Sequence, residues 1–306
     1  MEDVWVANAP VSFGVFELSE GEEGLPDPDE LAAAIAGGGY RGIDLGPVGY
    51  LGRGDRLRGR LARHGLALAG GFVPMRFADP DLFAADLSFL SDALDVFETA
   101  AEADSTAPLP KPTLADAGSP TRQANPGRGQ DMPEIGLSDD EWQAFAGRVT
   151  QAAKHVRERG LEPTFHHHAC TYVEAPGEIE LILELTDVGL CLDTGHLLLG
   201  GGDPLATLER WRDRINHLHL KDCRQAVVEL IVTERSGMRD VWSRGAFCGL
   251  ETGDLDVTAF LDKARAQEFS GWLVVEQDTL PHPDVALADI AAEQTANRQV
   301  LHHHGF

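Results

Sequence analysis

Eight apolar, strand-like runs alternate with amphipathic stretches along this chain of 306 residues, and no other feature limits its fold as strongly. Strands separated by helices predict a parallel sheet with crossover connections. We expect the strands at 4–13, 42–45, 67–73, a weakly marked stretch within 101–115, 163–168, 189–193, 217–221 and 272–276. The predicted fold class is therefore α/β, a (β/α)₈ TIM barrel that forms a single domain over residues 1–306.

Amphipathic stretches predict the helices that cover this barrel, at 29–36, 81–100, 138–159, 177–185, 204–214 and 258–267. Two segments do not fit the alternation. Residues 105–133 are rich in Pro, Gly, Ser and Asp and predict an extended loop, and residues 229–252 predict an irregular insertion before the last of these helices. Because loops this long in a compact domain are often functional, we expect both excursions to cover the mouth of the barrel.

Charge and composition exclude several classes of protein. The formal net charge of −25 would repel a phosphate backbone, which argues against a nucleic-acid partner. No run of eighteen apolar residues predicts a membrane span, and the first residues lack the basic start of a secretory signal. The four cysteines form no C-x-x-C pair, so we expect reduced, buried thiols in a cytoplasmic protein.

Three consecutive histidines, His166, His167 and His168, fall on the fifth predicted strand. Side chains on a strand alternate between its two faces, so His166 and His168 should share one face while His167 takes the other. Glu174 follows shortly after, where the chain leaves the sheet. In a TIM barrel the carboxyl ends of the strands carry the active site, so these polar groups are candidates for it.

The next three predicted strands also end in imidazoles or carboxylates. Asp193 ends the sixth strand and is followed by His196 after a Gly turn; His219 and Lys221 share a face of the seventh; Glu276 ends the last. Parallel strands bring these ends together around one ring. Nitrogen and oxygen ligands of this kind suit Mn²⁺, Co²⁺, Fe²⁺ or Zn²⁺ better than Ca²⁺, so the convergence predicts a divalent metal site.

Several stretches of the sequence resemble one protein family. The runs NAPVSFGVFE, GIDLGPVGYLG, FHHHACTYVEAPGEIELILELTD, VGLCLDTGHLLLGGGDP, INHLHLKDCR and GWLVVEQD are similar, in order and strand placement, to the xylose-isomerase-like TIM-barrel superfamily of sugar isomerases, epimerases and dehydratases. Within it they look closest to the myo-inosose-2 dehydratases. Asp44 departs from the pattern, because Glu is usual at its place in this branch.

The resemblance implies a metal held by one residue from each of the last four strands. Carried over by position, Asp193, His219 and Glu276 match the family's ligands, and His166 falls at the first ligand, where the wider superfamily often has Glu. His168 and Glu174 stay open as alternatives for this first ligand. The resemblance also implies that His196 and Lys221 contact substrate oxygens.

The function that we expect is dehydration of a keto-polyol such as 2-keto-myo-inositol through an enediolate, by a lyase that depends on one divalent metal. Mn²⁺ or Co²⁺ is favoured over Zn²⁺, Fe²⁺ or Mg²⁺. Candidates for the base are His168, Glu174 and Lys221, and His196 is a candidate acid. The substrate is thus a small polyhydroxylated sugar or inosose, and a homo-oligomer stays open.

Three alternatives to the dehydratase stay open as well. A ketose 3-epimerase or sugar isomerase of the same superfamily would share the enediolate and return the proton instead of expelling hydroxide. An apurinic endonuclease would need a basic groove, which the net charge of −25 disfavours. A metal-free sugar-binding barrel would hold no ion at all.

Overall fold

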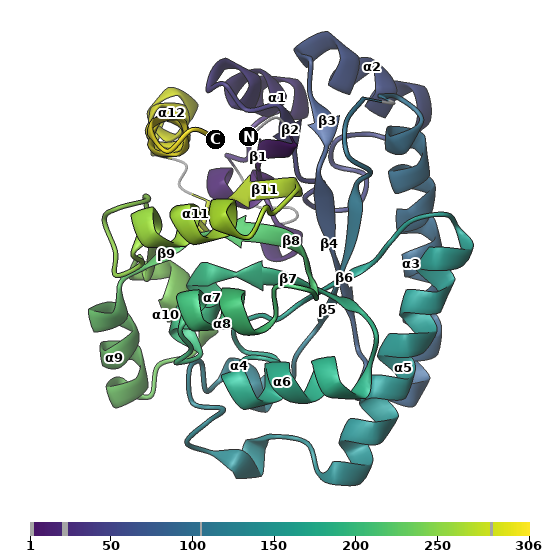
Figure 1. The fold of residues 1–306 in the computed structure, drawn as a ribbon, viewed down its shortest axis with the longest axis vertical. Coiled ribbons are helices and arrows are strands. Elements are labelled where there is room, and N and C mark those ends of the chain that lie inside the picture. The colour runs from purple at the N-terminus through teal and green to yellow at the C-terminus, as the bar shows by residue number, and fades with distance from the viewer. Residues whose placement is uncertain (1–2, 20–23, 105, 282–283) are drawn as a thin grey trace.

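A parallel sheet curled into a barrel forms the centre of the molecule, with helices around its outside (Figure 1). The computed structural model describes residues 3–19, 24–104, 106–281 and 284–306. The strands of the barrel are β1 (Val4–Asn8), β2 (Gly42–Ile43), β3 (Ala67–Leu68), β4 (Gly70–Met75), β5 (Lys111–Asp116), β6 (Thr164–His166), β7 (Gly189–Asp193), β8 (Ile215–Leu220) and β11 (Gly271–Val275). The predicted single-domain TIM barrel is confirmed.

The barrel closes at residues 67–75, where the first part of the segment pairs with one neighbouring strand and the second part pairs with another. In the order β3-β2-β1-β11-β8-β7-β6-β5-β4, the sheet begins with β3 and ends with β4, and only Ala69 separates these two strands along the chain. β3 pairs with β2, whereas β4 pairs with β5. The single strand predicted at 67–73 therefore supplies both ends of the sheet, and the eight predicted strand positions account for the whole barrel.

The longer helices lie outside the barrel and bury apolar side chains against it. The helices are α1 (Pro28–Gly37), α2 (Gly54–His64), α3 (Pro80–Ala101), α4 (Pro120–Gln123), α5 (Asp139–Glu158), α6 (Pro176–Leu185), α7 (Thr194–Leu199), α8 (Pro204–Arg210), α9 (Gln225–Glu234), α10 (Met238–Ser243), α11 (Val257–Ala266) and α12 (Leu287–His303), with short 3-10 turns η1 (Pro10–Phe13), η2 (Glu17–Ser19) and η3 (Pro133–Ile135). α10 instead contributes Met238 and Trp242 to the cavity described below. Among the described residues, no helix has both the length and the apolar character needed to cross a bilayer.

One predicted strand ends earlier in the structure, and two helices of the structure were not predicted. The first strand ends at Asn8 instead of residue 13, since Pro10 lacks a backbone N–H and begins η1. α2 and α12 were not predicted. α2 is mostly charged, and its buried apolar stripe consists of Leu57 and Leu61, too few for a clear helical pattern.

The two predicted excursions contain more regular structure than expected. β5 begins at Lys111 inside the segment 105–133, where it pairs with β4 and β6 despite Pro112. The segment 229–252 holds most of α9, all of α10, and β10 (Phe247–Cys248), which pairs with β9 (Asp222–Cys223). Half of the irregular insertion expected there is thus helical, because Ile231 and Val241 are buried against the core.

Asp116, at the end of β5, gives a first testable prediction. Its Oδ2 accepts the backbone N–H of Tyr172 at 2.8 Å, and burial raises the pKa of this carboxyl from 3.8 to about 7. Because the folded pKa lies above the unfolded one, the protein should lose stability as the pH rises through this window. Asn cannot ionise and keeps the acceptor, so Asp116→Asn should avoid that loss.

Thermal unfolding of both proteins at about pH 5 and about pH 8 measures the effect. The stability of Asp116→Asn relative to wild type should increase between these two pH values by a few kcal/mol, at roughly 1.4 kcal/mol per pKa unit. An advantage of the variant that stays the same or shrinks with rising pH would contradict the raised pKa.

Candidate active site

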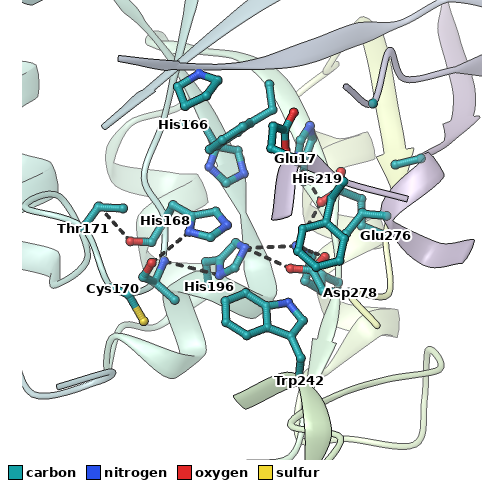
Figure 2. A pocket seen from close by; sticks show the side chains of 18 of the residues that line it. Glu17, His166, His168, Cys170, Thr171, His196, His219, Trp242, Glu276 and Asp278 are labelled. Atoms are coloured by element: carbon teal, nitrogen blue, oxygen red, sulfur yellow. Dashed lines mark hydrogen bonds and ion pairs between the residues drawn. The ribbon is translucent and has the colours of Figure 1, made fainter. Parts of the chain in front are cut away.

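A cavity of about 280 Å³ opens at the carboxyl ends of the strands (Figure 2). Such a volume suits a small molecule. Its polar lining comes from the strand ends, and its walls include apolar side chains such as Phe72 and Trp242. Both segments expected at the mouth contribute to it, Gln123 from the first and Met238 and Trp242 from the second.

Four side chains predicted as metal ligands meet at the floor of this cavity. One ligand atom from each of His166, Asp193, His219 and Glu276 lies within 4.8 Å of the others, and all four residues are buried. His166 Nε2 is 3.4 Å from Asp193 Oδ2, and His219 Nδ1 is 3.1 Å from Glu276 Oε2. The structure thus brings one residue from each of β6, β7, β8 and β11 to one point.

The sequence Asp193-Thr194-Gly195-His196 explains how β7 shapes this floor. Asp193 Oδ1 accepts the backbone N–H of His196 at 2.8 Å as the N-cap of α7, which leaves Oδ2 facing the floor. Thr194 Oγ1 donates to the carbonyl of Lys221 at 2.7 Å and accepts its N–H at 2.9 Å. A Cβ at Gly195 would lie 2.6 Å from Lys221 Cγ, so the absence of a side chain at Gly195 leaves space for the side chain of Lys221.

Lys221 lies among the carboxylates of the floor. Its Nζ is 3.1 Å from Asp193 Oδ2, 2.9 Å from Glu276 Oε2 and 2.6 Å from Asp278 Oδ1. Burial opposes the charge, but the three carboxylates outweigh it and raise the pKa of Lys221 well above its usual value. The side chain is therefore an ammonium group, which can donate protons in hydrogen bonds but cannot accept one.

The carboxylates around Lys221 keep their negative charge. Burial opposes ionisation of Glu276, yet His219 and Lys221 hold its pKa at about 2. Lys221 likewise holds the pKa of Asp193 well below its usual range against the effect of burial. Two ionised carboxylates on the floor would balance the charge of a divalent ion.

His168 and His196 face each other above this floor, with ring centroids 3.9 Å apart. His168 Nδ1 lies 2.8 Å from the carbonyl of Ala169 and donates to it, so its Nε2 carries no proton in the neutral ring. Burial lowers the pKa of His168 to about 4, and burial also lowers the pKa of His196 well below its usual value. Because both pKa values lie below 7, both rings are neutral at pH 7.

The structure does not bring Glu174 to the cavity, which corrects its placement as an alternative ligand or base. Its carboxylate accepts the backbone N–H groups of Cys170 at 2.5 Å and Gly127 at 3.1 Å, and it lies 3.7 Å from the guanidinium of Arg122. The chain turns after His168, so strand alternation no longer determines where residue 174 points. Glu174 instead anchors the loop that contains Gly127.

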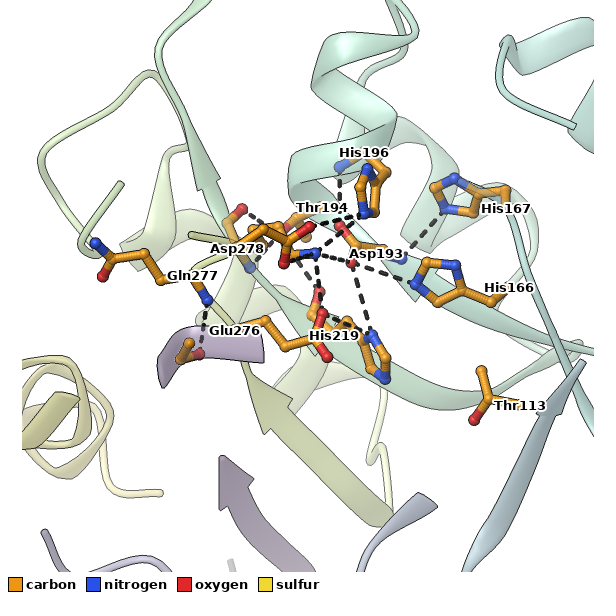
Figure 3. A network of polar contacts seen from close by, with 12 residues as sticks. Thr113, His166, His167, Asp193, Thr194, His196, His219, Glu276, Gln277 and Asp278 are labelled. Carbon is orange, nitrogen blue, oxygen red and sulfur yellow. Dashed lines mark hydrogen bonds and ion pairs between the residues drawn. The ribbon is translucent and has the colours of Figure 1, made fainter. Parts of the chain in front are cut away.

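His167 points away from the cavity, as strand alternation predicts. Its neighbours His166 and His168 line the cavity, whereas His167 Nε2 accepts the backbone N–H of Asp193 at 3.2 Å from the other face (Figure 3). We therefore expect His167→Ala to keep its metal content, while the lost hydrogen bond lowers the free energy of unfolding by roughly 1–3 kcal/mol. Metal analysis of the purified variant tests this, and loss of metal would contradict the placement of His167.

The floor has the chemistry that a divalent metal requires. Nδ1 of His166 and Nε2 of His219 are buried without a hydrogen-bond or ion-pair partner among the described residues. Buried polar atoms without partners are rare in folded proteins, and a metal would satisfy them. Cys191 also lies close to His166 and His219, but burial raises the pKa of its thiol to about 11. The residues His166, Asp193, His219 and Glu276 therefore fit a divalent ion.

Sequence reasoning assigned no role to three residues that the structure places at the cavity. Asp278 and Trp242 line it, and Asp44 does so with a pKa that burial raises to about 7. The spacing of Glu276 and Asp278 was a usable signal, because residues two apart on an extended chain share a face. No comparable signal marks Trp242, which reaches the cavity from α10.

The fold and the site together define a class, a TIM barrel with a cavity at the carboxyl ends of its strands and a cluster of charged side chains and imidazoles at its floor. The chain belongs to the xylose isomerase-like TIM barrel family, whose model matches residues 30–296. It is 31% identical over 285 residues to an inosose dehydratase of Geobacillus kaustophilus, covering 90% of this chain and 88% of the relative. An inosose dehydratase of Clostridium tetani is 33% identical over 148 residues, which is 47% of this chain and 50% of the relative.

Solved structures agree with the fold. A probable 3-DHS dehydratase from Bacillus anthracis superposes with a TM-score of 0.68 at 13% identity, covering 97% of this chain and 98% of that protein. A D-allulose 3-epimerase from Methylomonas sp. gives 0.67 at 11% identity, covering 99% of this chain and 97% of that protein. At these identities the likeness shows the fold alone and does not identify the reaction.

Proposed function

We propose that the protein is a metal-dependent lyase that removes water from a keto-polyol, with 2-keto-myo-inositol as the substrate of choice. One observation carries this proposal. The four-residue group of His166, Asp193, His219 and Glu276 lies at the floor of the same cavity as Lys221, His168 and His196. Similarity to an inosose dehydratase over 90% of the chain supports the choice of substrate. The cavity of about 280 Å³ has room for a single six-membered ring.

His166, Asp193, His219 and Glu276 would hold the metal. Bound there, a divalent ion would polarise the ketone and the hydroxyl beside it, which lowers the pKa of the α-proton. The metal is Mn²⁺ or Co²⁺ in this proposal, because a site of imidazoles and carboxylates suits both ions.

The reaction breaks one C–H bond and one C–O bond and forms one C=C bond. His168 takes the α-proton at its unprotonated Nε2, and an enediolate results. The positive charge of the Lys221 ammonium stabilises the negative oxygen. The β-hydroxyl then takes a proton from the facing pair of His168 and His196, which returns the proton that His168 removed from the substrate, and leaves as water. The products are an enolised dione and one water molecule.

Incubation of the metal-loaded protein with 2-keto-myo-inositol tests this proposal. We expect the absorbance of a conjugated or enolised dione and a product lighter than the substrate by one water. EDTA should abolish the signal, and Mn²⁺ or Co²⁺ should restore it. Absence of a dione, together with epimerisation of tagatose or fructose by the same preparation, would replace the dehydratase with a ketose 3-epimerase.

A further inference from the structure

Asp278 follows Glu276 by two residues, and its carboxylate bridges two other groups of the cavity. Oδ1 lies 2.6 Å from Nζ of Lys221, and Oδ2 lies 3.4 Å from Nε2 of His196. Figure 2 shows Asp278 beside His196 in the cavity. The residue is 5% exposed, so water has little access to it. Both groups that Asp278 touches have roles in the proposed reaction.

The hydrogen bonds around His196 have one consistent arrangement. The backbone N–H of Ala169 points to His196 Nδ1 at 3.4 Å, which makes Nδ1 an acceptor. A neutral imidazole with an acceptor at Nδ1 carries its proton on Nε2. Lys221 Nζ is 3.1 Å from that nitrogen, but its three protons already face three carboxylates. With the proton on Nε2, the carboxylate that His196 faces is Asp278, whose Oδ2 lies at an ion-pair distance of 3.4 Å.

Asp278 differs from the other two carboxylates that contact Lys221. Asp193 and Glu276 belong to the four-residue group that would hold a metal, so their oxygens would be shared with the ion. Asp278 is outside that group. It is therefore the carboxylate that stays paired with Lys221 whether or not a metal is bound.

A second metal is the competing explanation for Asp278. One ligand atom from each of His168, His196 and Asp278 lies within 4.8 Å of the others, which is close enough for a shared ion. The ammonium of Lys221, however, lies 2.6 Å from Asp278 Oδ1 and 3.1 Å from His196 Nε2. A fixed positive charge so close repels a divalent cation, so these atoms suit the lysine instead.

We infer that Asp278 is a positioning residue, which holds the Lys221 ammonium and the Nε2 proton of His196 in the orientation that proton transfer to and from the substrate requires. The inference rests on the proposed function for the identity of the reaction. Its geometric part, the bridge between Lys221 and His196, does not depend on which substrate is turned over.

Asp278→Asn tests the inference, because Asn keeps the shape of the side chain and removes its charge. We expect kcat for the dione to fall roughly 10–100-fold, as for other residues that orient a reacting group, while KM changes less than about threefold. Metal content should stay at one ion per chain. Asp240→Asn is the matched control, since Asp240 is an exposed carboxylate on α10 that pairs with Arg244 at 3.4 Å; it should keep the wild-type rate.

A second measurement needs no substrate. In ¹⁵N-histidine-labelled, Zn²⁺-loaded protein, the protected Nε2 proton of His196 should give a ring N–H signal that disappears in Asp278→Ala. Formate should restore part of the rate to Asp278→Ala, because a small carboxylate can enter the space that the side chain leaves. If wild-type protein turns over neither inosose nor ketose, the proposed function fails, and the ring signal alone decides the inference.

Three results would overturn the role of Asp278. An Asp278→Asn variant with the wild-type kcat would show that its charge is not needed. Loss of metal in parallel with activity, or two ions per wild-type chain, would make Asp278 a ligand. Failure of Asp278→Asn, Asp278→Ala and Asp278→Glu to fold would make the residue a purely structural one.

Discussion

Glu276→Gln should yield a folded protein that has lost both its metal and its activity. Glu276 ends β11 with its carboxylate 3.1 Å from Nδ1 of His219, and it belongs to the four-residue group on the cavity floor. The amide has nearly the same shape but no charge to balance a divalent ion. Since loss of an outer-shell partner alone costs about 10–100-fold in metal affinity, loss of a direct ligand should cost at least that much. Asp193→Asn should behave in the same way.

Metal analysis after gel filtration, together with the dione assay, measures this effect. Glu174→Gln is the matched control, because it makes the same change in another buried carboxylate that binds backbone N–H groups away from the cavity. Folded Glu174→Gln should retain its metal. Retention of metal by Glu276→Gln and its loss from Glu174→Gln would reverse the assignment of the ligands.

Lys221→Met should lower the rate of dehydration about 10²–10⁴-fold, the range for groups that take part in proton transfer, while the metal stays bound. Lys221 is 1% exposed and is kept charged by three carboxylates, so its positive charge can stabilise a negative substrate oxygen without its being a metal ligand. Its removal leaves buried negative charge uncompensated, which should destabilise the metal-free protein by roughly 3–5 kcal/mol. Added metal should restore part of that stability.

Lys111→Met is the control for this substitution. Lys111 begins β5 and so lies at the opposite end of the barrel from the cavity, because the strands are parallel. Steady-state kinetics and metal content of the two variants separate a role in the reaction from a general effect of charge. A Lys221→Met variant that loses its metal, or that keeps the wild-type rate, would contradict the role of Lys221.

The meeting of His166, Asp193, His219 and Glu276 was predictable from the sequence. All four lie at or directly beyond the carboxyl end of a predicted parallel strand, and such ends form one ring in a barrel. The alternation of side chains also separated His167 from its neighbours, because a period of two is a local property of an extended backbone.

Other residues could not be placed in this way. Glu174 lies in a loop, where direction depends on the contacts of the whole segment, and its carboxylate turns to Gly127 and Cys170 instead of the cavity. Trp242 lies on α10, in a segment whose sequence suggested irregular structure. That helix is stabilised by packing of residues such as Val241 against distant parts of the chain, which a local pattern does not record.

The sequence by itself determined the alternation of strands and helices, the parallel barrel, and the residues that end its last strands, since periodicity and chain direction are local. Tertiary structure alone decided which of these ends touch, and with which partners. Lys221 meets Asp278 across 57 positions of the chain, at 2.6 Å, because β8 and β11 are neighbours in the barrel. The protonation of Lys221 and Asp193 follows from those contacts, because burial and nearby charge are properties of the folded chain.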